Sequence, residues 1–197
     1  QLKALSIPGK DEKIESITAS LAGIAQATEK EKGDIAFQES QWEIASSHYK
    51  KALDSAATST GANSDSVYEL KQLVVKADLY ATISSGKDAF RKAQWDSAIS
   101  SYDQAIKILE SNREILKQAN TDENRKKLAR IMLQASVIRD QQDAARHLKE
   151  GEYQAATKQL EAIRDSIATS EFGSEPEFVA VMQEAEQAIA QAETDRL

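Results

Sequence analysis

The feature that most constrains this chain is a stretch of sequence that occurs twice. The segment GDIAFQESQWEIASSHYKKAL, residues 33–53, aligns with GKDAFRKAQWDSAISSYDQAI, residues 86–106, at an offset of 53 residues. The identical pairs are Gly33/Gly86, Ala36/Ala89, Phe37/Phe90, Gln41/Gln94, Trp42/Trp95, Ala45/Ala98, Tyr49/Tyr102 and Ala52/Ala105. Self-similarity at a fixed offset indicates a helical-repeat protein.

A third, more divergent copy follows 58 residues after the second. It has Leu148, Tyr153, Ala156, Leu160 and Ile163 where the second copy has Phe90, Trp95, Ala98, Tyr102 and Ala105. In each copy the last four of these positions recur at spacings of 3, 4 and 3, which places them on one face of a helix. Each copy therefore predicts two helices, joined by a tight turn, that pack against one another through alanine and large apolar side chains.

These residues resemble a tetratricopeptide repeat, which has a small residue in its first helix and alternating aromatic and alanine positions in its second. The matching residues are Gly33, Trp42, Ala45, Tyr49 and Ala52; Gly86, Trp95, Ala98, Tyr102 and Ala105; and Ala144, Tyr153, Ala156, Leu160 and Ile163. The copies recur at 53 and 58 residues, whereas the family repeats every 34, so the helices are expected to be longer. The resemblance implies an all-α, right-handed superhelix of antiparallel hairpins.

Composition agrees with a helical fold throughout. The chain of 197 residues has only two prolines and seven glycines, which favours helix over strand. We predict one domain, residues 1–197, with hairpins at about 10–57, 66–118 and 122–169 and a capping helix at about 175–195. The first helix has Ile14, Ile17, Leu21 and Ile24 at spacings of 3 and 4, which predicts a buried stripe. Trp42 and Trp95 are expected in the core.

Several segment ends have local signals. Ser66 with Glu69, and Ser174 with Glu177, have the spacing of a capping box, so we expect helices to begin there. Residues 58–64 are predicted to form a loop, and one helix is expected to run from Trp95 through Leu116.

The C-terminal segment is strongly acidic, with one arginine against seven acidic residues in positions 171–197. It also has one apolar stripe at spacings of 3 and 4: Phe178, Val181, Met182, Ala185, Ile189 and Ala192. A lone helix of this length is marginal in water. We therefore expect this helix to dock on the third hairpin as a cap. The alternative is that it lies across the concave face and shields that face from a partner.

Charge and residue usage exclude several classes of function. The net charge of -7 lies almost wholly in the C-terminal segment, so the body lacks the basic field that nucleic acid requires. The chain has no cysteine, which excludes disulfides and thiolate metal sites. No apolar run approaches the length of a membrane span, so no direct membrane insertion is expected. We expect a soluble piece of a longer chain and lean toward an extracytoplasmic location.

No catalytic constellation is evident. His48 and His147 are the only histidines, and neither has a metal-ligand partner at the usual sequence spacing. Ser47 with Lys50 and Ser84 with Lys87 have the spacing of some acyl enzymes but none of the accompanying motifs. We therefore expect neither an enzyme nor a cofactor or metal.

A binding surface remains. In tetratricopeptide proteins the first helix of each hairpin lines the concave face, and the matching positions here are Lys30, Asp34, Gln38, Tyr80, Ile83, Lys87, Arg91, Ile138, Gln141 and Lys149. Lys87, Arg91 and Lys149 would form a basic patch that faces a carboxylate-bearing peptide. The alternative is that these side chains are ordinary solvated helix charges.

We interpret the chain as a non-catalytic module that binds a peptide or helix of a protein partner on its concave face. The alternative is a structural or oligomerisation spacer of a larger, membrane-tethered or extracytoplasmic protein, which admits a homo-oligomer. A ligand-sensing domain is the third and less favoured interpretation.

Overall fold

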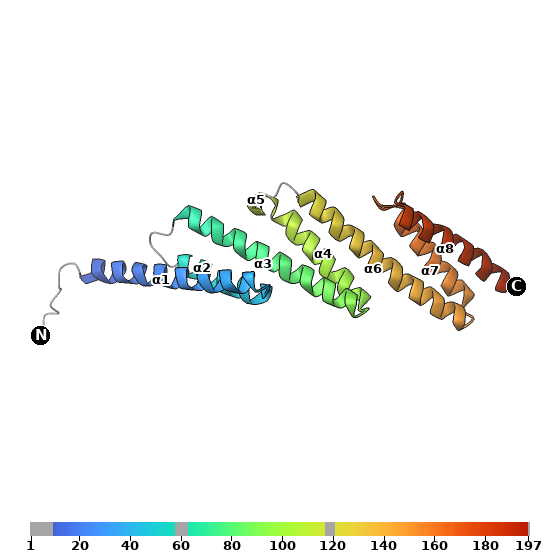
Figure 1. The fold of residues 1–197 in the computed structure, drawn as a ribbon, viewed down its shortest axis with the longest axis horizontal. Helices are drawn as coiled ribbons and strands as arrows, with labels where there is room; N and C mark the ends of the chain where they lie inside the picture. The colour runs from blue at the N-terminus through green and yellow to red at the C-terminus, as the bar shows by residue number, and fades with distance from the viewer. Residues whose placement is uncertain (1–9, 58–62, 117–120, 197) are drawn as a thin grey trace, which may run out of the picture. The chain divides into compact units, whose positions relative to one another are not determined.

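A computed structural model describes residues 10–57, 63–116 and 121–196, and these residues are helical with no strand. The helices are α1 (Lys10–Gln38), α2 (Trp42–Ala57), α3 (Ser64–Arg91), α4 (Trp95–Ser111), α5 (Arg113–Leu116), α6 (Thr121–Lys149), α7 (Tyr153–Ala168) and α8 (Pro176–Asp195), as drawn in Figure 1. The all-α class is confirmed. The chain divides into unit 1, up to Ala81 with Ile108–Ala119, and unit 2, Thr82–Lys107 with residues from Asn120 on.

In unit 1, α1 and α2 form a closely packed hairpin. A methyl group built on Gly33 would lie 2.5 Å from Cε1 of Tyr49, whose ring is 1% exposed. Only glycine allows the helices to come this close with the ring between them. Ala36 and Ala45 complete the contact, and Ala77 of α3 packs on the same cluster. The repeat identities therefore mark the helix contact, as predicted.

The same turn closes each of the three copies. The second residue after each first helix has a left-handed backbone conformation: Ser40 has φ 61°, Ala93 has φ 54° and Gly151 has φ 77°. The next amide donates back to a carbonyl five residues earlier, Gln41 to Ala36 at 2.9 Å, Gln94 to Ala89 at 2.9 Å and Glu152 to His147 at 2.8 Å. This pattern is a Schellman motif, which satisfies the last carbonyls of a helix.

In unit 2, α6, α7 and α8 share one apolar cluster. Its buried members are Val137, Ala144, Leu160, Ile163, Ile167, Phe172, Phe178 and Ala185. Ala144 stands where the other copies have glycine, and Leu160 stands where they have tyrosine. The extra methyl group of the alanine is thus matched by a smaller side chain on the facing helix. Phe178 and Ala185 belong to α8, so the prediction that this helix docks on the third hairpin is confirmed.

Ion pairs hold the start of the acidic segment against α6. Arg125 lies 3.1 Å from Glu171, and Arg130 lies 2.8 Å from both Glu175 and Glu177. Pro176 begins α8. The predicted Ser174 capping box is wrong, because Glu175 precedes the helix and makes no side-chain capping hydrogen bond.

The prediction of a buried stripe in the first half of α1 is wrong. Ile14, Ile17, Leu21 and Ile24 are between 51% and 64% exposed. The antiparallel partner α2 ends at Ala57, and α3 begins level with Gln26, whose side chain donates to Ser66 at 2.7 Å. The first half of α1 therefore extends past both neighbours (Figure 1).

The two tryptophans are partly buried and do not fill the core as predicted; the fully buried rings are those of Tyr49 and Tyr102. Each tryptophan is the first residue of its helix and stands edge-on to a phenylalanine, with centroids 4.8 Å apart for Phe37 and Trp42 and 5.2 Å for Phe90 and Trp95. A ring at the tip of a hairpin retains contact with solvent on one side.

Two other helix limits differ from the predictions. Helix α3 begins at Ser64, two residues before the predicted capping box, and the Asn63 side chain accepts the Asp65 amide at 3.0 Å. The helix expected from Trp95 to Leu116 is interrupted at Asn112, whose side chain donates to the Ile108 carbonyl at 2.9 Å. Most of the predicted loop, residues 58–62, lies outside the described residues.

Candidate functional site

Two adjoining hollows in unit 2 form a groove along one face of α6. The first, of about 380 Å³, is lined by Lys87, Phe90, Arg91, Tyr102, Ile131 and Gln134. The second, of about 260 Å³, is lined by Phe90, Gln134, Val137, Ile138, Gln141, Glu177, Phe178 and Val181. Because Phe90 and Gln134 line both, the two hollows adjoin at these residues. We call these residues together the α6 groove.

The floor of the α6 groove follows from the periodicity of α6. Ile131, Gln134, Ile138 and Gln141 are spaced by 3, 4 and 3 residues, which places them on one face of the helix. The end of α3 supplies one wall through Phe90, and the first turns of α8 supply the other through Phe178 and Val181. The groove is thus a strip of apolar side chains with two glutamines along its floor.

The charges lie toward the ends of the α6 groove. Lys87 and Arg91 are exposed on the wall of the first hollow, and Arg91 also pairs with Asp88 one turn earlier. Glu177, at the second hollow, accepts hydrogen bonds from Gln134 at 3.1 Å and from Arg130 at 2.8 Å. An amphipathic segment with acidic groups near one end fits this pattern chemically.

Of the predicted concave-face residues in unit 2, Lys87, Arg91, Ile138 and Gln141 line the α6 groove. Ile83 is partly buried on α3 and lines neither hollow, and Lys149 is exposed as the last residue of α6. The basic patch predicted from three cations therefore contains two in this groove.

In unit 1 the predicted residues mainly hold helices together. The Tyr49 hydroxyl donates to Asp34 at 2.9 Å, and Lys30 lies 3.0 Å from Asp34 and 3.4 Å from Glu69. The hydrogen bond to Asp34 raises the pKa of Lys30, and burial followed by the same carboxylate raises the pKa of Tyr49. The charged and polar groups of Lys30, Asp34 and Tyr49 therefore already have hydrogen-bond or ion-pair partners within the fold.

The remaining two predicted residues of unit 1 are more exposed. Tyr80 is 43% exposed and stacks on Trp42, with ring centroids 5.0 Å apart. Gln38 is exposed in the last turn of α1.

Sequence reasoning missed most of the apolar lining. The sequence predicts packing roles for Phe90 and, in the docking stripe of α8, for Phe178 and Val181, but the same side chains also border the α6 groove. The one sequence signal for the groove was the spacing of Ile131, Gln134, Ile138 and Gln141, which places these residues on one face of the helix.

Each histidine contacts a glutamate. His48 Nδ1 lies 2.8 Å from Glu29, and hydrogen bonds from Lys32 and His48 lower the pKa of Glu29 from 4.5 to about 2. His147 Nδ1 lies 2.6 Å from Glu152, and with Glu150 these groups have potential ligand atoms within 4.8 Å of one another. Glu150 lies 3.8 Å from Arg146. Both carboxylates thus have a nitrogen-bearing neighbour, and we assign no metal to them.

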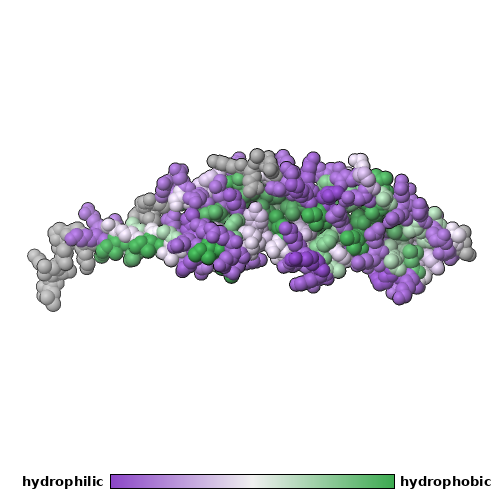
Figure 2. Space-filling view, viewed as in Figure 1, coloured by the Kyte–Doolittle hydropathy of each residue, from purple (hydrophilic) through white to green (hydrophobic). Residues whose placement is uncertain are grey.

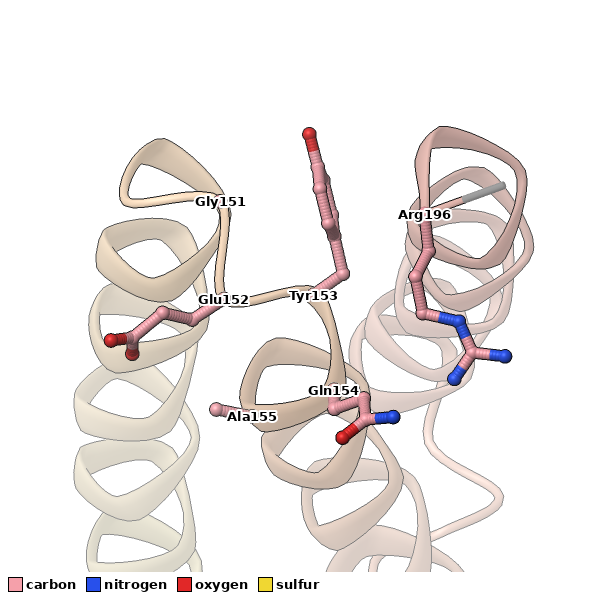
Figure 3. A pocket seen from close by; sticks show the side chains of 6 residues that line it. All are labelled: Gly151, Glu152, Tyr153, Gln154, Ala155 and Arg196. Atoms are coloured by element: carbon pink, nitrogen blue, oxygen red, sulfur yellow. The ribbon is translucent and has the colours of Figure 1, made fainter.

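A shallow hollow of about 460 Å³ lies beside this cluster, at the start of α7. Figure 3 shows Glu152 pointing toward the end of α6, while Tyr153 points out past the ends of the helices. Arg196, after α8, lies on the side of Gln154. Only Tyr153 and Ala155 of its lining offer apolar side chains, so it offers less to an apolar partner segment than the α6 groove does.

No described helix is both long enough and apolar enough to cross a membrane. Comparisons of the chain with protein-family models, curated proteins and solved structures gave no match.

Proposed function

We propose that the chain is a non-catalytic interaction module of tetratricopeptide-like type, a right-handed superhelix of hairpins that binds a helix or peptide of a protein partner. The binding site is the α6 groove, which corresponds to part of the concave face expected from the resemblance. The observation that carries this proposal is that the two hollows adjoin at Phe90 and Gln134 along one face of α6.

The repeat itself supports the tetratricopeptide-like part of the proposal. The left-handed turn residue recurs at equivalent positions, Ser40, Ala93 and Gly151. The small residue of the first helix also meets the large residue of the second in each copy, as Gly86 meets Tyr102. Three copies with the same turn and the same contact are what a hairpin repeat requires.

The lining of the α6 groove defines the partner segment. Phe90, Ile138 and Val181 favour apolar side chains on one face of the segment, as in helix-in-groove recognition. Lys87 and Arg91 favour acidic side chains at one end. We therefore expect an amphipathic segment with an acidic end.

A displayed library of such peptides tests the proposal. Enriched peptides are resynthesised, and their Kd is measured by fluorescence polarisation. K87E/R91E should weaken binding by about tenfold, since two rim charges contribute roughly 1 kcal/mol or somewhat more together. I138E, which places a carboxylate on the apolar floor, should weaken it further.

The matched control is K158E/R196E, which reverses two exposed charges of unit 2 outside the α6 groove. It should leave the Kd unchanged. Equal affinities for the wild type, K87E/R91E and I138E would place the binding site elsewhere and refute the proposal.

A second role is favoured by a different observation. The exposed stripe of Ile14, Ile17, Leu21 and Ile24 on α1 suits the alternative of a structural spacer that assembles through its end.

A further inference from the structure

The first half of α1 presents a row of large apolar side chains to solvent. The exposed fractions are 51% for Ile14, 60% for Ile17, 61% for Leu21 and 64% for Ile24. In Figure 2 the end of α1 that extends past its neighbours shows a continuous hydrophobic band. Exposed apolar rows of this kind mark interaction sites.

The fold of unit 1 leaves this row uncovered for a geometric reason. The inward face of α1 is defined by Gln26, Gly33 and Ala36, which are buried or partly buried. At about 100° per residue the exposed row lies roughly a third of a turn around the helix from that face. A longer α2 would therefore still leave it open.

The sequence around the row is unusually free of charge. Residues 16–28 contain no Asp, Glu, Lys or Arg. The four apolar residues occupy alternating positions of a coiled-coil seam, spaced by 3, 4 and 3. Thr18, Ser20, Ala25 and Ala27, which flank the seam, are small and uncharged, so a second helix can approach closely.

We propose that this row binds the same row of a second copy, with the two α1 helices antiparallel. Ile14 then faces Ile24 of the second copy, and Ile17 faces Leu21. The spacing of 3, 4 and 3 reads the same from both ends, which is the self-complementarity that a two-fold interface needs. No charge within residues 16–28 discriminates against an identical helix.

The charges at the start of α1 select the antiparallel arrangement. Glu12 lies just before the row, and Glu15 lies within its first turn, next to Ile14. A parallel pair would bring both sets of glutamates together, whereas an antiparallel pair separates them. Antiparallel helices also oppose their dipoles favourably.

The available area limits the strength of this contact. If a fully exposed Ile or Leu offers roughly 120 Å² of apolar surface, the eight large side chains of a pair bury about 600 Å². Flanking residues add to this, but the total stays below the roughly 1,200 Å² at which standard interfaces begin. We therefore expect a concentration-dependent dimer with a Kd from about ten to a few hundred micromolar.

This inference rests on the alternative assembly role of the chain and not on the α6 groove. The first test is sedimentation equilibrium of the full chain from about 5 μM to about 1 mM. The wild type should change from monomer to dimer over this range. I17E/L21E places carboxylates opposite one another and should remain monomeric.

I44E is the matched control, because Ile44 is 50% exposed on α2, outside the row. It should dimerise as the wild type does. Far-UV circular dichroism should be equal for all three proteins, because none of the substituted side chains is buried. A monomeric wild type at about 1 mM, or an I17E/L21E variant that dimerises normally, would overturn the proposal and leave the row to a different chain.

Cross-linking tests the orientation. The chain has no cysteine, so single substitutions give unambiguous disulfides. Mixed I14C and I24C proteins with tags of different mass should form the heterodisulfide, while I14C alone should not cross-link. Efficient cross-linking of I14C with itself would refute the antiparallel arrangement.

The experiments distinguish failure of the α6 groove proposal from failure of the dimer proposal. Peptides selected for the α6 groove should bind I17E/L21E with wild-type affinity. A dimer that forms without any such peptide binding would refute the groove proposal and leave this inference standing.

Discussion

Replacing Gly86 by alanine tests how closely α3 and α4 approach in unit 2. The new methyl group would lie 2.9 Å from Cε1 and 3.1 Å from Cδ1 and Cζ of Tyr102. The ring of Tyr102 is 2% exposed, so it has little room to move. Overpacking of this kind costs about 1 to 3 kcal/mol, and the higher helix propensity of alanine returns about 1 kcal/mol. The expected net loss is about 1 kcal/mol, with an upper bound near 2 kcal/mol.

The third copy supplies the compensating change. Ala144 and Leu160 stand where the second copy has Gly86 and Tyr102, and both are buried in one cluster. Y102L alone should leave a cavity and cost about 2 kcal/mol. G86A/Y102L should lose about 1 kcal/mol less than the sum of the single changes, because the methyl group fills part of that cavity.

Urea unfolding followed by the fluorescence of Trp95 measures these differences, in a W42F background so that only unit 2 reports. G23A is the matched control, because nothing lies within 4 Å of a methyl group built on Gly23. It should gain about 0.5 to 1 kcal/mol, measured by circular dichroism. If G86A is as stabilising as G23A, or if the double variant is additive, the close approach of α3 and α4 does not depend on this glycine and the reasoning fails.

Four other outcomes are expected. A93G should raise the stability by about 1 kcal/mol and G151A should lower it by a similar amount, because both residues are left-handed, and thermal unfolding checks the signs. Y49A should cost about 3 to 5 kcal/mol and W42A clearly less, because only the tyrosine is fully buried; equal losses in urea unfolding would contradict this. Since the folded pKa of Glu29 is about 2 against an ordinary 4.5, its contribution to stability is present above pH 4.5 and is lost as the pH falls toward 2. The difference in unfolding free energy between the wild type and E29Q should accordingly disappear near pH 2. Deleting residues 175–197 should expose Ile163 and Ile167 and cause aggregation in light scattering, and an unchanged melting temperature would show that α8 is no cap.

The repeat predicted the helix contacts well because the residues that recur between copies are those at which the two helices of a hairpin touch. A glycine opposite a tyrosine, followed by alanines at spacings of 3 and 4, leaves few alternatives. Periodicity alone states that a face is apolar without stating what covers it. The spacing of Ile17 and Leu21 therefore predicts a core position, whereas α2 is too short to reach them and packs against another face of α1.

The candidate site was predictable only in part. Lys87 and Arg91 followed from their repeat positions. The wall made by Phe178 and Val181 depends on how α8 lies against α6, which its own periodicity does not encode. The left-handed turn residues Ser40 and Ala93 could not be predicted, because serine and alanine give no such signal, whereas a glycine such as Gly151 does.

The ion pairs of Arg125 and Arg130 with the acidic segment make the seating of α8 responsive to the kind of salt present. These pairs are partly exposed, so sodium chloride, which shortens the Debye length to about 8 Å at physiological strength, weakens them. The apolar contact of Phe178 and Ala185 responds in the opposite direction to sulfate, which is excluded from protein surfaces and strengthens burial. Both salts should therefore loosen the first turn of α8 by screening its ion pairs, while sulfate in addition tightens the apolar contact of its body.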